Sequence, residues 1–196
     1  MDDTISIDSV TPLAREWGRL DRYEVTHARR DGTRQTVLRE VYDHGSAAAV
    51  LMYAPATRSV ILTRQFRLPP HLNGDPAWLI EVPAGLLDGE ASEIAARREA
   101  IEETGYDPLD LRLVCNVYMS AGSLTEKCAC YIARYLPGEK LSSGGGLQEE
   151  GEDIEVFELD IDAALAMIVT GEIADAKTVL LLQALALTLA GSTSTP

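Results

Sequence analysis

The first half of the chain alternates strand-forming runs with turn signals. Residues 22–42 have β-favouring residues on both sides of Asp31-Gly32, a strong turn signal, and therefore predict a β-hairpin. Two apolar runs, 47–53 and 59–66, predict a second pair of strands. The segment 68–78 is rich in proline, glycine and asparagine and predicts an exposed connecting loop.

The middle of the chain predicts a strand, a tight loop and then a helix. The apolar run 78–80 is followed by residues 83–89, where proline and glycine favour a loop. Ser92 is placed to cap the start of a helix, and Gly105 is placed to end it. We therefore expect one helix between these two residues.

Three carboxylates define one face of this helix. Glu99, Glu102 and Glu103 have i, i+3, i+4 spacing, which puts them on one arc of about 100°. Ile94, Ala100 and Ile101 are expected on the opposite side, so we expect that side to be buried and the carboxylate side to face a cleft. Such a cluster alone most often marks a solvated surface. Like charges at this spacing repel, however, and Mg²⁺ and Mn²⁺ prefer carboxylate oxygens, so a cation site is the other interpretation.

Further strands follow the helix. They are expected at 111–118 and 127–135, and a short one at 154–159 follows a flexible glycine-rich loop over 137–152.

The chain then predicts two helices. Asp160 is placed to cap a helix over 161–170, and Asp175 is placed to cap a last helix that ends near Gly191. The last helix is apolar almost all round, which implies burial on several sides, partly against another subunit. Strands, helix, strands and helices in this order predict an α/β sandwich with a mixed sheet between helices.

Composition and charge narrow the function classes. The 196 residues are 46% hydrophobic and 24% charged, as in a globular domain, and the net charge is −14. Such an acidic surface argues against nucleic acid and against an anionic membrane as partners. We see no targeting signal and no apolar run of membrane-spanning length, so the cytoplasm is the expected compartment.

The cysteines and histidines offer no metal motif. Three cysteines lack metal-site spacing and are expected to be reduced core thiols: Cys115, Cys128 and Cys130. Three histidines are scattered and are expected on the surface or in loops: His27, His44 and His71.

A longer motif surrounds the three carboxylates. Gly85, Glu90 and the run Arg98 to Tyr106 (REAIEETGY) resemble the Nudix box, the signature of hydrolases that split a nucleoside diphosphate linked to another moiety. The family pattern is G, five residues, E, seven residues, REUXEEXGU, where U is bulky and apolar. This chain is one residue shorter between Gly85 and Arg98, so Glu90 is out of register with the family's first glutamate.

The resemblance extends over roughly residues 15–185. The chain is similar to the nucleoside-diphosphate-sugar branch of the Nudix hydrolases, which includes ADP-ribose pyrophosphatases, and is more similar still to the GDP-mannose pyrophosphatases. The shared stretches include 39–43, 64–67, 144–146 and 152–156. The resemblance implies a Nudix fold, an α/β/α sandwich with a mixed β-sheet, plus an N-terminal antiparallel β-hairpin region.

It also implies a domain organisation. We expect an N-terminal hairpin region over 1–45, a Nudix domain over 46–191 and a disordered tail over 192–196. The resemblance implies a homodimer in which the N-terminal strands cross to the partner, so that Trp17 and Arg39 serve the neighbouring active site.

Site residues follow from the resemblance position by position. The expected cofactor is Mg²⁺, with Mn²⁺ as a substitute. The implied metal ligands are Glu99, Glu103 and the carbonyl of Ala84, with Glu102 and Glu152 as further candidates. Glu99, Glu103 and Glu152 are the implied catalytic residues. Glu152 is the implied general base, and Glu149 and Glu150 are the alternatives.

The implied substrate contacts come from several segments. They are Trp17, Arg39, Glu40, Arg67, Gly85, Leu86, Glu126 and Lys177. Judged without the resemblance, Arg39 and Arg67 fit surface strand positions equally well, and Lys177 fits a solvated charge.

The expected activity is Mg²⁺-dependent hydrolysis of the pyrophosphate bond of a nucleoside diphosphate sugar. GDP-mannose, giving GMP and mannose 1-phosphate, is the expected substrate, and ADP-ribose, giving AMP and ribose 5-phosphate, is the alternative. A catalytically silent Nudix protein that binds a ligand is a third interpretation, which the retained Glu99, Glu102 and Glu103 disfavour.

Overall fold

A computed structural model describes residues 4–192 of the chain. These residues form two compact units. Unit 1 contains the chain up to Ser46 together with Tyr118–Lys127, and unit 2 contains Ala47–Val117 together with the chain from Cys128 onward. The predicted disordered tail, apart from Ser192 at its first position, lies outside the described residues.

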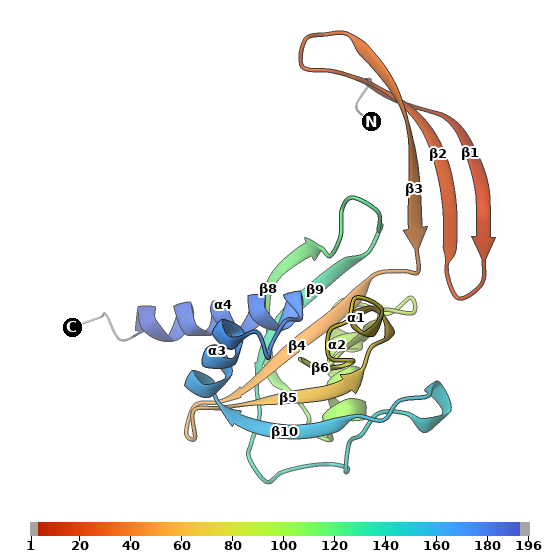
Figure 1. The fold of residues 1–196 in the computed structure, drawn as a ribbon. Coiled ribbons are helices and arrows are strands. Elements are labelled where there is room, and N and C mark those ends of the chain that lie inside the picture. The colour runs from red at the N-terminus through yellow and green to blue at the C-terminus, as the bar shows by residue number, and fades with distance from the viewer. Residues whose placement is uncertain (1–3, 193–196) are drawn as a thin grey trace. The chain divides into compact units, whose positions relative to one another are not determined.

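Unit 1 is an antiparallel sheet of three strands in the order β1-β2-β3 (Figure 1). The strands are β1 (Ile5–Arg15), β2 (Arg19–Ala28) and β3 (Arg34–Asp43). The predicted hairpin is β2 and β3, and its turn is fixed by Asp31, whose carboxylate accepts from the N–H of Thr33 at 3.0 Å. β1 was not predicted. Its apolar and polar residues alternate only over a short stretch, and no strong turn signal separates it from β2.

Unit 2 is built on a mixed sheet. Its strands are β4 (Ala47–Ala54), β5 (Ser59–Phe66), β6 (Trp78–Glu81), β7 (Ala84–Leu86), β8 (Leu109–Tyr118), β9 (Lys127–Arg134) and β10 (Glu155–Asp160). The order is β10-β5-β4-β9-β8, while β6 pairs with β5 and β7 pairs with β4. β4 runs parallel to β9 and antiparallel to β5 and β7, so the predicted mixed sheet is confirmed.

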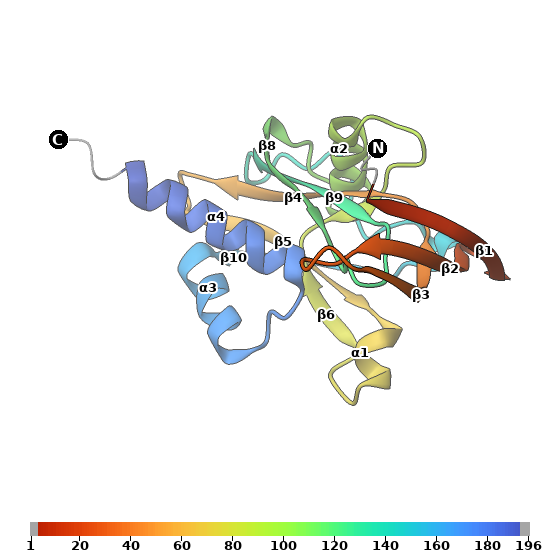
Figure 2. The same cartoon turned by 90° about the horizontal axis from the view of Figure 1, so that it is seen from above.

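Helices lie on both faces of this sheet. They are α1 (Leu68–Leu72), α2 (Ser92–Thr104), α3 (Ile161–Thr170) and α4 (Ala176–Ser192), with a 3-10 turn at Gln148–Glu150. Figure 2 shows α2 on one side of β4 and β5, and α3 and α4 on the other side. The predicted α/β/α sandwich is thus confirmed.

β4 is the centre of the core, because every one of its residues is buried. Alternate side chains of a strand point to the same face, so the even-numbered residues of β4 pack on α2. That cluster includes Ala48, Val50, Met52 and Ala54 from β4 and Ala95, Ala96 and Ala100 from α2. Alanines on the helix let its backbone approach the sheet closely.

Helix α2 differs from its prediction in two ways. Its N-cap is Ala91 rather than Ser92, whose hydroxyl instead lies 2.7 Å from the Tyr131 hydroxyl. Ala100 is buried as predicted, but Ile94 is 58% exposed, so that part of the predicted buried side faces solvent. Glu103 is on the buried side, because the alanines beside it provide the contact with the sheet. Gly105 ends the helix as predicted, with φ at 78°.

The last two helices begin where they were predicted. The Asp160 side chain accepts from the N–H groups of Asp162 and Ala163, and α3 ends at Gly171 with φ at 84°. The Asp175 carboxylate accepts from the N–H of Thr178 at 2.9 Å, at the start of α4. In both cases the short acidic side chain pairs N–H groups that the first helical turn leaves without partners.

Two predicted loops contain regular structure. The segment 68–78 includes the short helix α1, in which Pro69 and Pro70 occupy early positions that need no N–H donor. The tight loop predicted over 83–89 contains β7, which pairs with β4 through Ala84 and Gly85.

Cys128 and Cys130 are buried, and Cys115 is partly buried. The prediction of surface or loop histidines is confirmed for His71, which is exposed, and for His44, which lies in the loop between β3 and β4. His27 differs, because it lies part-buried within β2. No helix within residues 4–192 is both long and apolar enough to cross a membrane.

Candidate active site on helix α2

The carboxylates of α2 face β7. Glu103 is 3% exposed, and its Oε1 accepts from the backbone N–H of Ala84 at 3.1 Å. Glu99 lies against Gly85, where a Cβ atom would collide with the Glu99 carboxylate. Glycine at position 85 therefore allows this side chain to lie flat on the strand. Glu102 is nearer solvent, with 28% of its side chain exposed.

One arginine neutralises the outer edge of this face. The Arg98 guanidinium contacts Glu99 Oε1 at 2.8 Å, Glu102 Oε2 at 3.2 Å and Glu90 Oε2 at 3.0 Å. Arg98 also donates to the carbonyl of Leu86 at 3.0 Å. Burial lowers the pKa of Arg98, but the three carboxylates outweigh it, so the pKa is raised.

Glu103 has a different environment. Within residues 4–192 it makes no ion pair, although its carboxylate is almost fully buried. Burial raises the pKa of Glu103 well above its usual value; the Ala84 N–H opposes this, and Glu99, Glu152 and Glu81 add to it. Burial also raises the pKa of Glu99, although Arg98 opposes the change. A cation next to these oxygens would favour their charged forms.

The residues fit a divalent cation by chemistry and by charge. Among the described residues, no three His, Cys, Asp or Glu side chains converge closely enough to hold an ion as they stand. The oxygens are turned to internal partners instead: Glu99 to Arg98, Glu103 to Ala84 and Glu152 to Leu147. Hard oxygen donors and excess buried negative charge are nevertheless what Mg²⁺ requires.

Glu152 reaches the same region from the loop before β10. Its Oε2 accepts from the N–H of Leu147 at 2.9 Å, and its Oε1 lies 3.5 Å from Nε2 of Gln65. The same loop also holds Glu149 and Glu150, which belong to the 3-10 turn that begins at Gln148. The charge of Glu152 helps to raise the pKa of both Glu99 and Glu103, so Glu152 lies near the carboxylates of α2.

Three glycines attach this loop to the end of α2, and we call residues 144–146 the glycine strap. The N–H groups of Gly145 and Gly146 donate to the carbonyls of Glu103 and Glu102 at 2.8 and 3.2 Å. All three glycines have positive φ, at 67°, 107° and 77°. The strap thus pairs carbonyls at the helix end and fixes the start of the loop that carries Glu152.

Two cationic side chains, Arg67 and Lys177, form ion pairs with carboxylates outside α2. Arg67, at the start of α1, contacts Glu81 at 2.8 Å, and Lys177, in the first turn of α4, contacts Asp175 at 2.9 Å. The Arg67 side chain is 38% exposed, whereas that of Lys177 is 15% exposed. Lys177 is therefore a partly buried, paired cation and not a solvated charge.

A comparison with known protein families shows to which family the chain belongs. A family model described as NUDIX domain matches residues 43–182. The chain belongs to the NUDIX family.

Individual relatives agree with this assignment. GDP-mannose pyrophosphatases from Salmonella arizonae, Shigella flexneri and Escherichia coli are each 47% identical over 161 residues, which is 82% of this chain and 82% of theirs. The crystal structure of an ADP compounds hydrolase has the same fold, with a TM-score of 0.73 at 19% identity over 98% of each chain. The predicted Nudix hydrolase is confirmed.

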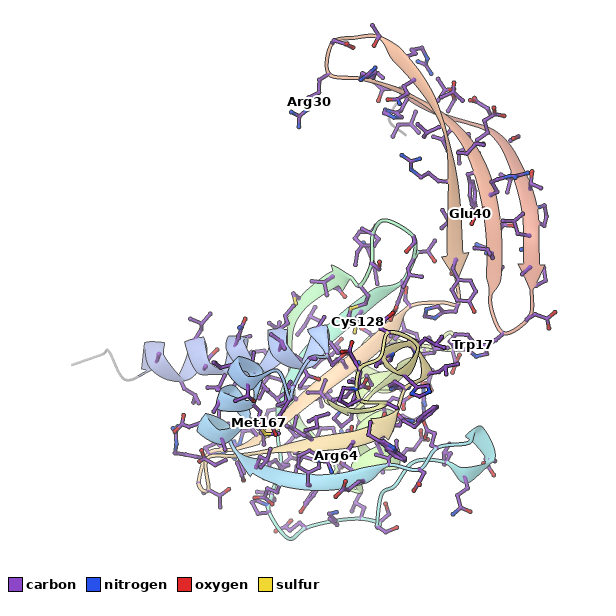
Figure 3. The ribbon with its side chains drawn as sticks, viewed as in Figure 1. Trp17, Arg30, Glu40, Arg64, Cys128 and Met167 are labelled. Atoms are coloured by element: carbon purple, nitrogen blue, oxygen red, sulfur yellow. The ribbon has the colours of Figure 1, made fainter. Side chains whose placement is uncertain are left out.

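The remaining predicted Nudix substrate contacts lie in unit 1. Trp17 is 72% exposed, and Glu40 is exposed on β3 (Figure 3). Arg39, its neighbour on β3, is exposed as well. Trp17 stacks on His44 with ring centroids 5.0 Å apart, and His44 Nε2 lies 3.6 Å from Glu126. Unit 1 thus places two of these residues next to one histidine.

Sequence reasoning missed three parts of the site. His44 lacked a recognisable spacing, and Glu81 follows an apolar run that indicated only a strand. Arg98 was visible in the Nudix box, but its contacts with three glutamates depend on the fold of the loop from Leu86 to Glu90.

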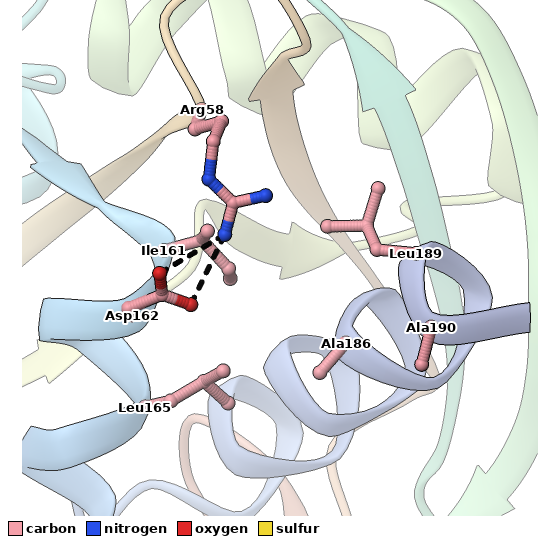
Figure 4. Close-up of a pocket in the computed structure, with 7 residues that line it drawn as sticks. All are labelled: Arg58, Ile161, Asp162, Leu165, Ala186, Leu189 and Ala190. Carbon is pink, nitrogen blue, oxygen red and sulfur yellow. Dashed lines mark hydrogen bonds and ion pairs between the residues drawn. The ribbon is translucent and has the colours of Figure 1, made fainter. Parts of the chain in front are cut away.

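Another hollow lies away from these residues, between α3 and α4. It has a volume of about 250 Å³ and is lined by Arg58, Ile161, Asp162, Leu165, Ala186, Leu189 and Ala190 (Figure 4). Its polar feature is the ion pair of Arg58 with Asp162 at 3.0 Å. It contributes no residue to the Nudix box.

The buried carboxylate of Glu103 lowers the free energy of unfolding when it is charged. Since its pKa is raised by folding, the wild type loses stability as the pH rises above about 4.5, the value without burial. With EDTA at pH 8, we expect Glu103→Gln to raise the free energy of unfolding by about 1 kcal/mol or more. Mg²⁺ should then stabilise the wild type and not the variant in thermal unfolding. Equal stability of both proteins in EDTA would contradict this account. The control in EDTA alone is Glu102→Gln, which removes a carboxylate that is 28% exposed and paired with Arg98, and which should not raise the free energy of unfolding.

The glycine strap can be tested with a matched pair of variants. Gly144 and Gly138 both have positive φ, but a Cβ would collide with the end of α2 at Gly144 and would meet open space at Gly138. Both alanine variants share the backbone strain, so urea unfolding should show Gly144→Ala to be less stable than Gly138→Ala by about 1–3 kcal/mol. Equal urea midpoints of the two variants would show that the glycine strap is not closely packed against the end of α2.

Proposed function

We propose that the chain hydrolyses the pyrophosphate bond of GDP-mannose, giving GMP and mannose 1-phosphate, with Mg²⁺ as its cofactor. The observation that carries this is the carboxylate pair of Glu99 and Glu103 in a Nudix box, because Glu103 is buried and makes no ion pair within residues 4–192. The GDP-mannose pyrophosphatases that are 47% identical to the chain support the choice of substrate. The net charge of −14 agrees with a site that needs cations to receive an anionic substrate.

Glu99, Glu103 and the Ala84 carbonyl would hold the ion, with Glu102 and Glu152 as further ligands. A divalent ion there would neutralise charge on the phosphates and make a water molecule more acidic. Glu103 is already oriented toward Ala84 by its hydrogen bond to that backbone N–H. Gly85 keeps the strand flat against Glu99, so the strand and the helix can share one ligand set.

Glu152 is the proposed general base. Its carboxylate lies on a loop fixed at one end by the glycine strap and at the other by β10. It would take a proton from water as the water oxygen bonds to phosphorus and the bridging P–O bond breaks. Arg67 and Lys177 would contact the phosphates, since a guanidinium fork and an ammonium both suit phosphate oxygens.

The chain is also proposed to form a homodimer. β1 is exposed over nearly its whole length, and unit 1 exposes several large apolar side chains: Ile5, Ile7, Val10, Leu13 and Leu38. A sheet with so much uncovered apolar surface requires a partner, and a second copy of the chain supplies a matching surface. In such a dimer Trp17, Arg39, Glu40 and Glu126 would contribute substrate contacts. The cytoplasmic location stays a prediction.

Turnover tests the activity directly. GDP-mannose and ADP-ribose are supplied side by side, with Mg²⁺ or with EDTA, and the nucleotide product is identified. We expect GMP from GDP-mannose in the presence of Mg²⁺ and a loss of about 10²-fold or more in kcat for Glu103→Gln and for Glu152→Gln. If AMP is released from ADP-ribose faster than GMP is released from GDP-mannose, the proposed substrate is wrong and ADP-ribose takes its place. Turnover that survives EDTA would contradict the metal-dependent reaction, and no turnover of either substrate would favour a silent ligand-binding protein.

The dimer can be tested by mixing two inactive variants. Trp17→Ala removes an implied substrate contact in unit 1, and Glu103→Gln removes an implied metal ligand in unit 2. If unit 1 serves the partner's site, co-expressed variants should regain part of the wild-type activity, because one mixed site is then intact. Light scattering should show a dimer. A monomer, or no regain of activity in a proven mixed dimer, would contradict the proposal.

A further inference from the structure

Glu81 is a buried carboxylate that lies at the end of β6 and outside the Nudix box. It is 4% exposed. Its Oε2 lies 2.8 Å from Nη2 of Arg67 and 3.5 Å from Nζ of Lys177. Arg67 Nε is also 3.2 Å from Glu81 Oε1. One carboxylate therefore contacts two cations that come from distant parts of the sequence.

The backbone of Glu81 is fixed on both sides. β6 pairs with β5 through Glu81 and Thr63, and the Thr63 hydroxyl donates to the Glu81 carbonyl at 3.2 Å. The next N–H, that of Val82, donates to the hydroxyl of Thr178 at 2.8 Å. Thr178 is fully buried in the first turn of α4. The end of β6 and the start of α4 are thus joined next to the carboxylate.

A second carboxylate completes the cluster. Asp175 Oδ1 lies 2.9 Å from Lys177 Nζ, while Asp175 Oδ2 accepts from the N–H of Thr178 at 2.9 Å. Two carboxylates therefore face two cations, and the cluster of Arg67, Glu81, Asp175 and Lys177 is neutral. Burial lowers the pKa of Lys177, but Glu81 and Asp175 outweigh it, so the pKa is raised and the ammonium stays charged.

This arrangement limits where the two cations can lie. A free lysine or arginine side chain samples many rotamers, whereas a chain held by a buried carboxylate is already oriented. Orientation of binding groups before the reaction lowers the barrier, and a displacement of 1 Å can cost about 10²-fold in rate.

We propose that Glu81 is a positioning residue that holds the Arg67 fork and the Lys177 ammonium side by side for the phosphates of the substrate. The inference rests on the proposed function, because it assigns both cations to the substrate. Glu81 acts through the two cations and takes no part in the metal site.

Glu81→Gln tests the proposal, since it removes the charge and keeps the size of the side chain. We expect kcat to fall on the order of tenfold while KM changes by less than about threefold. Unchanged kcat would overturn the proposal. A lower KM with unchanged kcat would also overturn the proposal, because this is the result expected if Glu81 only competes with the phosphates for the two cations. The matched control is Glu155→Gln, which breaks the exposed 2.8 Å pair of Glu155 with Arg64 and should leave kcat unchanged.

A second readout does not depend on turnover. The chain has three lysines, at positions 127, 140 and 177, so acetylation of each can be followed by mass spectrometry. Lys127 and Lys140 are exposed and should react first, whereas Lys177 should react slowly in the wild type. In Glu81→Gln, Lys177 loses one of its two carboxylates and should react about fivefold faster or more. An equal Lys177 rate in the two proteins would overturn the proposal.

The two readouts separate the failure of this inference from that of the proposed function. If the wild type turns over no nucleoside diphosphate sugar, the proposed function fails, yet the lysine rates still test the hold of Glu81 on Lys177. If circular dichroism shows that Glu81→Gln does not fold, Glu81→Asp is the second variant. It keeps the negative charge but shortens the side chain by one methylene. We expect Glu81→Asp to keep Lys177 protected and to lose part of kcat. Full kcat in Glu81→Asp would overturn the proposal.

Discussion

Buried negative charge between α2 and β7 is the constraint on which the rest of unit 2 depends. Glu99 and Glu103 lie against Ala84 and Gly85, where burial raises the pKa of both carboxyls. Glu99 is paired with Arg98, whereas Glu103 makes no ion pair within residues 4–192. A buried carboxylate without a cation is unfavourable, so the fold loses stability at Glu103. Sites that bind charged ligands commonly carry such strain, because the ligand removes it.

The neighbouring structure holds this charge in place. Arg98 neutralises the outer edge of the carboxylate face, and the glycine strap fixes the carbonyl end of α2 against the loop that carries Glu152. On the adjacent strand end, Arg67 and Lys177 form ion pairs with Glu81. The carboxylates of α2 suit a metal ion, and the two cations beside Glu81 suit phosphates.

Local signals in the sequence predicted most of the fold. Asp160, Gly171 and Gly105 mark helix ends through their own backbone chemistry, so these boundaries were predicted correctly. The Nudix box likewise indicated Glu99 and Glu103 as candidate site residues. The burial of the carboxylate side of α2 was not predictable, because periodicity cannot tell that Ala95 and Ala96, and not Ile94, pack on the sheet. The pairing of Glu81 with Lys177 also escaped prediction, since it joins residues 96 positions apart.

The most direct measurement is the anomalous scattering of Mn²⁺ in crystals of the wild-type protein. The account predicts a peak within about 2.5 Å of carboxylate oxygens of both Glu99 and Glu103, and loss of that peak in Glu103→Gln. A saturating Mn²⁺ soak that shows ions elsewhere and none on these two side chains would contradict the central claim that the buried carboxylates of α2 are a divalent-cation site.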